Sequence, residues 1–238
     1  MAIDFWITYK QRIIFALLLS FSAVVSCFAF RGLNASSIAF RHGESLLSQG
    51  NVTEALESFH IAAAASGLRP PLALKLAHAA FLAGDTTLCK NVLIGIISSQ
   101  SRLTPDVLNA VAGRFDSLEM PLMALTALRR AGDAVVESEP SALYLAELES
   151  RVGDVVASEM LYRNILNKKP DNILASLGLA QLLAWHGRVQ EAETLCESVL
   201  DRNPHNRKAR LVLGRVLTAA GRFDDAIIQY RQALEETQ

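Results

Sequence analysis

The sequence predicts an all-α fold of stacked helix-turn-helix repeats, and three observations predict it. Gly153, Gly187 and Gly221 stand 34 residues apart. Pro170 and Pro204 keep the same interval. The composition is 51% hydrophobic but only 7% aromatic, which suits helices packed on one another. A fixed period of this length with a glycine in mid-repeat is typical of a helical repeat stacked on copies of itself.

Six repeats can be laid along the chain, with Thr104 as one extra residue between the second and the third. Their bounds are 36–69, 70–103, 105–138, 139–172, 173–206 and 207–238. The eighth position of each repeat carries a small residue: Gly43, Ala77, Ala112, Ala146, Ala180 and Gly214. The twentieth position is small as well: Ala55, Cys89, Ala124, Ser158, Ala192 and Ala226. Position 24 carries the partner residue, bulky in all but one repeat: Phe59, Leu93, Leu128, Tyr162, Cys196 and Tyr230. Small residues at positions 8 and 20 let the second helix of a repeat pack closely on the first.

The turn between the two helices contains glycine in every repeat except the third. Glycine can adopt the left-handed conformation that ends a helix without a Cβ penalty. In the third repeat Glu119 stands at the glycine position, and Met120-Pro121 follows it. We expect proline to supply the break there, and a local irregularity at this turn.

This pattern resembles the tetratricopeptide repeat family, in which positions 8, 20 and 27 are small, glycine lies near position 15 and proline at 32. The resemblance implies a right-handed superhelix whose function is to bind proteins. One departure is general, because the aromatic residue common at position 4 in the family is absent from all six repeats. Cys89 and Cys196 fall on core positions and are expected to be buried apolar thiols.

The family resemblance implies that the first helices line a concave groove that holds a protein or peptide partner. Carried over residue by residue, the candidate groove residues are Phe40, Glu44, Leu74, His78, Phe81, Asn109, Glu147, Arg151, Gln181, Trp185, Lys208 and Arg215. The mixture of an apolar floor and isolated charges suits an amphipathic helix or an extended peptide. Two interpretations stay open for Trp185, which either contacts the partner as a hot spot or packs within the array.

Residues 13–30 carry no charge, and residues 1–12 and 31–35 flank this segment on its two sides. As a helix its eighteen residues would span about 27 Å, close to the roughly 30 Å of a bilayer core. We expect a transmembrane signal anchor. Val24-Val25-Ser26-Cys27 also resembles a bacterial lipobox, so lipidation at Cys27 after cleavage, or simple cleavage of a signal peptide, stays open.

The anchor predicts a single-pass protein of the inner membrane with a periplasmic repeat array, because Lys10, Arg12 and the free amino terminus favour a cytoplasmic N-terminus. The lipoprotein alternative predicts the outer membrane instead.

A net charge of −1 argues against a general electrostatic grip on nucleic acid. The five histidines lack metal-site spacing, and neither a phosphate-binding loop nor a nucleophile elbow is present. We therefore expect no enzyme, no cofactor and no metal.

The predicted function is a membrane-anchored scaffold or assembly factor in a bacterial envelope machine for secretion, pilus formation, polysaccharide export or cytochrome maturation. Two alternatives are a permanent structural subunit of a membrane complex and a repeat lipoprotein lipidated at Cys27. We also expect the C-terminal helix, through Ile228 or Tyr230, to contact a partner or a second copy of the chain.

Overall fold

The computed structural model describes residues 34–99 and 103–235, and every regular element in that part of the chain is a helix. Residues 13–30, including Cys27, lie outside the described residues, as does the linker up to residue 33. The anchor, lipoprotein and signal-peptide interpretations therefore stay predictions. Within the described ranges, no helix has both the length and the apolar character needed to span a bilayer.

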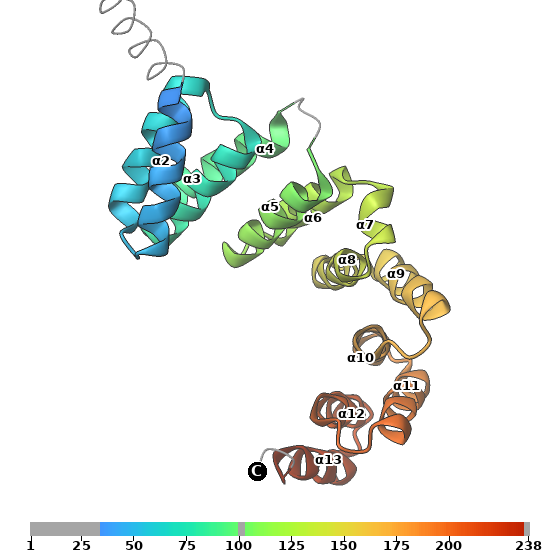
Figure 1. Ribbon diagram of the computed structural model, residues 1–238. Coiled ribbons are helices and arrows are strands. Elements are labelled where there is room, and N and C mark those ends of the chain that lie inside the picture. Colours follow the sequence, from blue (N-terminus) through green and yellow to red (C-terminus); the bar gives the residue numbers. More distant parts are fainter. Residues whose placement is uncertain (1–33, 100–102, 236–238) are drawn as a thin grey trace, which may run out of the picture. The chain divides into compact units, whose positions relative to one another are not determined.

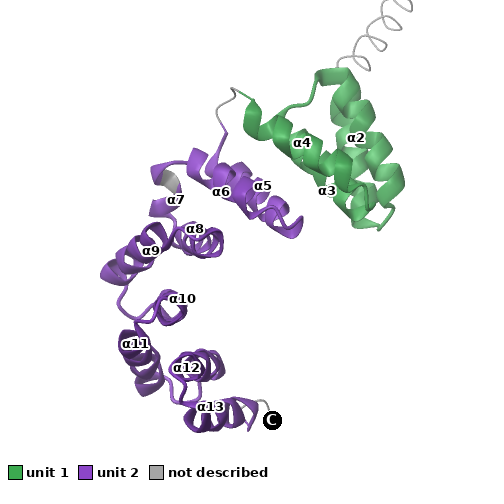
Figure 2. Cartoon of the chain, turned by 180° about the vertical axis from the view of Figure 1, so that it is seen from behind, with its two compact units in different colours: residues 1–99 green, residues 100–238 purple. Residues whose placement is uncertain are grey.

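The helices form two compact units, which meet in the sequence between Ser99 and Gln100 (Figure 2). The first contains a helix at residues 34–48, α2 (Val52–Ser66), α3 (Pro70–Leu82) and α4 (Thr86–Ser98). The second contains α5 (Pro105–Ser117), α6 (Pro121–Arg130), α7 (Asp133–Glu137), α8 (Glu139–Val152), α9 (Val155–Lys168), α10 (Ile173–Trp185), α11 (Val189–Arg202), α12 (Arg207–Ala219) and α13 (Phe223–Glu235). Successive helices pack as hairpins, so each unit is a piece of a helical array (Figure 1).

Short polar residues begin many of these helices by capping their first turn. The Asp85 and Asp154 carboxylates accept hydrogen bonds from the backbone N–H groups three residues on, at 2.9 and 3.1 Å. Asn172 and Asn206 do the same at the starts of α10 and α12, both at 2.9 Å. Each cap satisfies an amide that has no partner inside the helix. The 34-residue period thus repeats the helix starts as well as the turns.

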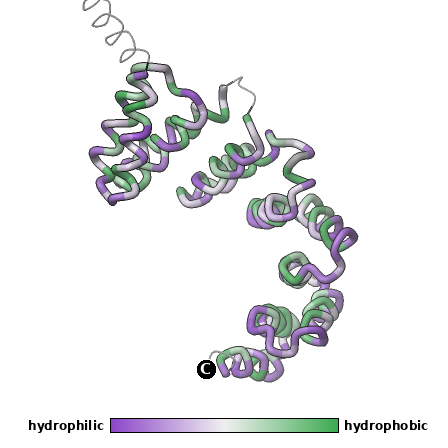
Figure 3. Tube along the Cα trace, in the orientation of Figure 1, coloured by the Kyte–Doolittle hydropathy of each residue, from purple (hydrophilic) through white to green (hydrophobic). Residues whose placement is uncertain are grey.

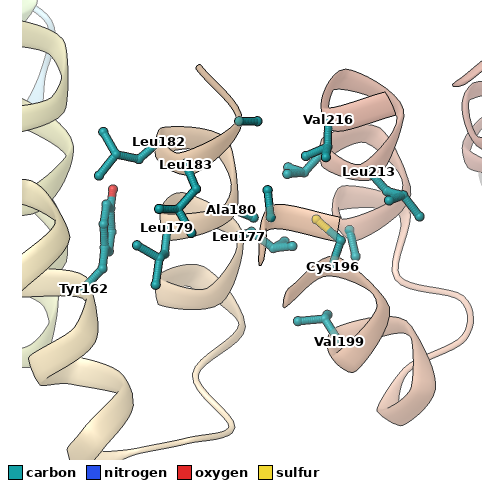
Figure 4. Packing of buried hydrophobic residues seen from close by; sticks show 14 of the residues in the cluster. Tyr162, Leu177, Leu179, Ala180, Leu182, Leu183, Cys196, Val199, Leu213 and Val216 are labelled. Atoms are coloured by element: carbon teal, nitrogen blue, oxygen red, sulfur yellow. The ribbon is translucent and has the colours of Figure 1, made fainter. Parts of the chain in front are cut away.

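The core of the second unit lies between neighbouring hairpins, where a first helix such as α10 is covered on both sides. Tyr162 of α9 and Val216 of α12 lie on either side of the α10 leucines (Figure 4). Hydrophobic and hydrophilic residues are interspersed along most helices (Figure 3). The helix α10 is largely apolar, with eight of its thirteen residues buried, as expected for a helix packed between neighbouring hairpins. Cys196 lies inside the core, where burial raises the pKa of its thiol to about 12. Cys89 is buried in the first unit.

The third repeat departs from the pattern in a different way from the one expected. Glu119 itself adopts the left-handed conformation, with φ 57°, and is the only non-glycine residue in the described chain to do so. Pro121 then starts α6 at its first turn. The first helix, α5, is regular. The second helix is broken instead, because α6 ends at Arg130 and the short α7 follows Gly132, whose φ is 59°.

Arginines hold consecutive repeats together at the start of their second helices. The Arg188 Nη1 atom donates to both carboxylate oxygens of Glu159 in the preceding repeat, each at 2.9 Å. Arg222 makes the equivalent bond to Glu193 at 2.7 Å. Glu159 and Glu193 both occupy position 21 of their repeats. Position 21 therefore faces the following repeat.

Candidate functional site

A groove of about 670 Å³ opens on the second compact unit and is formed by α8, α10 and α12, with Tyr162 from α9. All three are first helices of their repeats. Its lining residues are Glu139, Pro140, Leu143, Tyr144, Glu147, Ser150, Arg151, Tyr162, Leu174, Leu177, Gly178, Gln181, Leu182, Trp185, Lys208 and Val212. Five of the residues expected from the sequence meet here: Glu147, Arg151, Gln181, Trp185 and Lys208.

Helical periodicity explains why these residues share one surface. On α8, Pro140, Leu143, Glu147 and Ser150 follow at intervals of three and four, so their side chains lie along one face. On α10, Leu174, Leu177, Gln181 and Trp185 also follow at intervals of three and four. Stacking the two hairpins sets these faces side by side, so the groove follows from the repeat itself.

Trp185 is the most prominent apolar group in the groove. Its side chain is 61% exposed, so it does not pack within the described array. Leu174 on the same helix is also exposed, at 51%. Leu143 and Leu177 supply a more buried apolar floor. An exposed indole above an apolar floor can bury a large area when a second molecule covers it.

Two charged side chains that line the groove have no partner among the described residues. Neither Glu147 on α8 nor Lys208 on α12 makes an ion pair or a hydrogen bond with any described residue. Arg151 differs, because its Nη1 donates to Asp116 of α5 at 2.6 Å. Gln181 accepts a 3.4 Å hydrogen bond from Arg215 of α12. The groove thus offers one acidic and one basic group for recognition.

Tyr144 adds a polar atom to the groove wall. Burial raises the pKa of its hydroxyl well above the ordinary value, and the negative charge of Asp116 raises it further. The group therefore stays protonated. Its oxygen is shielded from solvent, and Asp116 is the acidic group that acts on it. Asn109 Oδ1 is also shielded and has no hydrogen-bond partner among the described residues, although its Nδ2 donates to Ser141 at 2.8 Å.

Tyr162 lies at the bottom of the groove, because Gly178 leaves room for its ring. A Cβ atom at Gly178 would come within 2.6 Å of the ring carbon Cζ. Burial, and then the charge of Glu147, raises the pKa of Tyr162 to about 12. Gly178, Tyr144 and Val212 all occupy position 6 of their repeats. The family resemblance did not supply this position, and the small residue opposite an aromatic one was the only signal for it.

The remaining candidate residues lie elsewhere. In the first compact unit, Phe40 packs on Phe59 with ring centroids 5.8 Å apart, and Glu44 pairs with Lys75 at 2.8 Å. Leu74, His78 and Phe81 are half-buried there. Asn109 lies at the α5–α8 contact, and Arg215 reaches the groove only through Gln181.

Comparison with known proteins finds the same fold. Residues 186–238 match a family model described as tetratricopeptide repeat. No curated protein matches the chain. A tetratricopeptide repeat protein from Parabacteroides merdae is 16% identical, with a TM-score of 0.73 over 85% of this chain and 80% of that one.

Two further solved structures cover most of both chains. PilF of Pseudomonas aeruginosa is 16% identical, with a TM-score of 0.55 over 85% of this chain and 98% of its own. PilW, described as a widely conserved type IV pilus biogenesis factor, is 14% identical, with a TM-score of 0.57 over 83% and 91%. At these identities the likeness is one of fold.

Proposed function

We propose that this chain, a tetratricopeptide repeat protein, is a binding scaffold that holds a peptide segment of a partner protein in the groove of α8, α10 and α12. One observation carries the proposal: Trp185 projects into the groove and is 61% exposed. An indole that is exposed to solvent adds little to the stability of the array. A partner that covers it buries apolar area, and this burial stabilises the complex. The proposed role is therefore binding rather than catalysis.

The groove also specifies the chemistry of the bound segment. An apolar or aromatic side chain would rest on Trp185 and the floor formed by Leu143 and Leu177. A basic residue would pair with Glu147 on α8, and an acidic residue with Lys208 on α12. Charges placed this way on either side of an apolar anchor favour one direction of the bound peptide over the reverse.

A displayed library of random peptides, selected against the full-length protein, tests this proposal. The enriched peptides should carry an apolar anchor with flanking charges. Calorimetry should show that Trp185→Ala weakens the binding of these peptides by about 2 kcal/mol or more, roughly thirtyfold in affinity. Met160→Ala is the matched control, because Met160 is an exposed apolar residue of α9 outside the groove. The proposal fails if no peptide is enriched, or if the enriched peptides bind the Trp185→Ala variant as tightly as the wild type.

We further propose that residues 13–30 anchor this scaffold in a bacterial inner membrane, with the array in the periplasm, where it serves an envelope machine. The support is the uncharged run itself, with Lys10 and Arg12 before it. PilW is a pilus biogenesis factor of similar fold, which makes pilus assembly the first machine to examine. A permanent subunit of a membrane complex and a lipoprotein modified at Cys27 are the competing proposals.

Fractionation and intact mass separate these proposals. An anchored protein should remain in the membrane after carbonate washing and keep the mass of the full chain. A mature form that begins at a lipid-modified Cys27, and whose processing stops in Cys27→Ser, would instead establish the lipoprotein. After mild detergent extraction, a permanent subunit should elute in one stoichiometric complex, whereas a scaffold should separate from its clients.

A further inference from the structure

The helix α13 carries an apolar stripe on one side. Phe223, Ile227 and Leu234 are 62%, 47% and 64% exposed, and Tyr230 is half-buried between them. Their spacing of four, three and four residues places all four side chains along one face of the helix. Within the described residues α13 packs closely on α12 alone. The Tyr230 ring lies partly against Gly214 of α12, and the other three residues of the stripe have no cover in the described chain.

The stripe lies on the side of α13 that receives the next repeat in earlier parts of the array. Ile227 occupies the same position as Glu159 and Glu193, which accept hydrogen bonds from Arg188 and Arg222 of the following repeats. Tyr230 corresponds to Tyr162, which is only 5% exposed because α10 covers it. The outer face of α13 therefore has the geometry of an interface between repeats.

The chemistry of this face differs from that of an ordinary interface between repeats. An isoleucine replaces the glutamate that would hold the arginine of another repeat of the same kind. The face is not a polar cap either, because all four residues of the stripe are aliphatic or aromatic. Such a face fits another apolar helix surface.

The charges beside the stripe indicate which helix that is. Asp224 and Arg231 each follow a stripe residue by one position, so both lie along the same edge, two turns apart. Both are exposed, and neither has an ion-pair or hydrogen-bond partner among the residues that the structure describes. Ile228 and Glu235 also follow stripe residues by one position, but at about 100° per residue they lie further round the helix from the stripe than Asp224 and Arg231 do. The edge nearest the stripe is thus acidic at Asp224 and basic at Arg231, and Glu235 lies one turn beyond Arg231.

We infer that α13 binds α13 of a second copy of this chain, antiparallel and stripe against stripe. A twofold axis perpendicular to the helices, through the middle of the stripe, brings equal edges together in reversed order. Asp224 of each copy then meets Arg231 of the other, and this pairing occurs twice. In a parallel pair each edge would face the opposite edge of its partner, which carries Ala226 and Ala233 and offers no charge to match.

The contact is centred on Ile227 and Tyr230 and leaves Ile228 out, although the sequence had suggested Ile228. Position 22 is Met160 in α9 and Thr194 in α11, and both are exposed on the outer surface of the array. Ile228 points in the same direction. Because one helix pair buries less than the roughly 1,200–2,000 Å² of a standard interface, the dimer should dissociate on dilution.

Sedimentation of the full-length protein over a range of concentrations, in one detergent throughout, tests the apolar contact. The wild type should show a concentration-dependent dimer. Ile227→Glu should weaken it by roughly tenfold or more, because the glutamate would be buried in the stripe. Ile228→Glu is the matched control, a change of the same size and charge at a neighbouring residue that is 50% exposed, and it should leave the dimer unchanged.

Charge exchange tests the antiparallel arrangement. Asp224→Arg and Arg231→Asp should each weaken the dimer by about threefold to tenfold, because each places like charges opposite one another. The double variant should restore it, since the two pairs form again with reversed signs. Circular dichroism checks that all variants keep their helix content. The inference does not depend on the groove, so the groove's peptide affinity should be the same in all of them.

A strictly monomeric wild type would overturn the inference. It would also be overturned if Ile228→Glu disrupted the dimer as strongly as Ile227→Glu, since the contact would then lie elsewhere. A double charge variant that stays as weak as the single variants would show that another protein, or another face of this chain, covers α13.

Discussion

Phe59 lies against the backbone of Gly43, so that a Cβ atom at Gly43 would stand 2.7 Å from the ring carbon Cε1. The same relationship joins Tyr230 to Gly214, where the distance would be 2.5 Å. Repeats that have alanine at position 8 carry a smaller partner at position 24 in three cases, such as Leu93 beside Ala77. Positions 8 and 24 are therefore matched in size in five of the six repeats, and in the fourth the Tyr162 ring lies against Gly178 of the next repeat instead.

Gly43→Ala tests this matching. Alanine is favoured over glycine in a helix by about 1 kcal/mol, but Phe59 is fully buried and cannot move aside, so we expect a net destabilisation of roughly 1–3 kcal/mol. Phe59→Leu in the same chain should recover most of the loss, because Ala and Leu are the pair found in the second repeat. A double-mutant cycle from urea unfolding measures the coupling. If the effects of the two substitutions on the free energy of unfolding simply add, positions 43 and 59 are not matched in size.

Much of the array could be predicted from the sequence because a fixed period carries information about which side of each helix is buried. All six residues at position 20, from Ala55 to Ala226, are buried as expected. The groove was only partly predictable. The family resemblance assigned Trp185 to the inner face, but whether an indole projects or packs depends on the neighbouring side chains. Tyr144 was missed because it occupies position 6, which the family resemblance did not supply as a groove position.

The third repeat shows a second limit. A glycine inside a helical pattern can either continue the helix or end it, and only the packing around it decides. Gly132 ends α6, while Gly178 lies within α10 and makes room for Tyr162. In the sequence alone, both glycines lie within a helical pattern and cannot be told apart. The break before α7 could therefore not be predicted.

At the turn that contains Glu119, we predict that one substitution stabilises the protein. Its φ of 57° is costly for a residue with a Cβ atom, and the other repeats place glycine at this point. Glu119→Gly should therefore stabilise the protein by about 0.5–1 kcal/mol in thermal or urea unfolding. Ser117→Gly is the control, because Ser117 ends α5 in an ordinary helical position and glycine should destabilise it. Equal effects from both substitutions would mean that the left-handed turn carries no strain.

Position 20 provides a test of the helix register. Ala192 is fully buried where α11 packs on α10, so Ala192→Leu should overpack this contact and cost roughly 1–3 kcal/mol. Gln190→Leu adds a side chain of the same size two residues earlier on the exposed side of α11, and should change stability by less than about 0.5 kcal/mol. Thermal melts that place both variants at the same temperature would show that the register is wrong.

The ion pairs between repeats predict an acid dependence. The pKa of Glu159 is lowered from 4.5, first because Arg163 donates a hydrogen bond to it and then because Arg188 does, while burial opposes the shift. A carboxylate with a lowered pKa in the folded state adds stability above its unfolded pKa and loses that contribution as the pH falls through the folded pKa.

Glu159→Gln should therefore lower the unfolding midpoint in urea at neutral pH and make almost no difference at roughly pH 3. Glu197→Gln on α11 is the control, because Glu197 is exposed and no ion pair joins it to another described residue. A deficit of the same size at both pH values would mean that the glutamine disturbs packing rather than removing a charge.

Arg129 binds a buried carboxylate, and we expect that breaking this ion pair lowers the free energy of unfolding more than the other substitutions do. Glu149 is 2% exposed, and Arg129 binds it through two hydrogen bonds, 2.9 Å from Nε and 2.8 Å from Nη2. Arg129→Met would leave the charge of Glu149 buried without a partner, at a cost of about 2 kcal/mol or more in urea unfolding. Replacing both residues by methionine removes the buried charge together with its partner, so the double variant should be more stable than the single one. If the double variant is the less stable of the two, the pair contributes net stability and does more than neutralise Glu149.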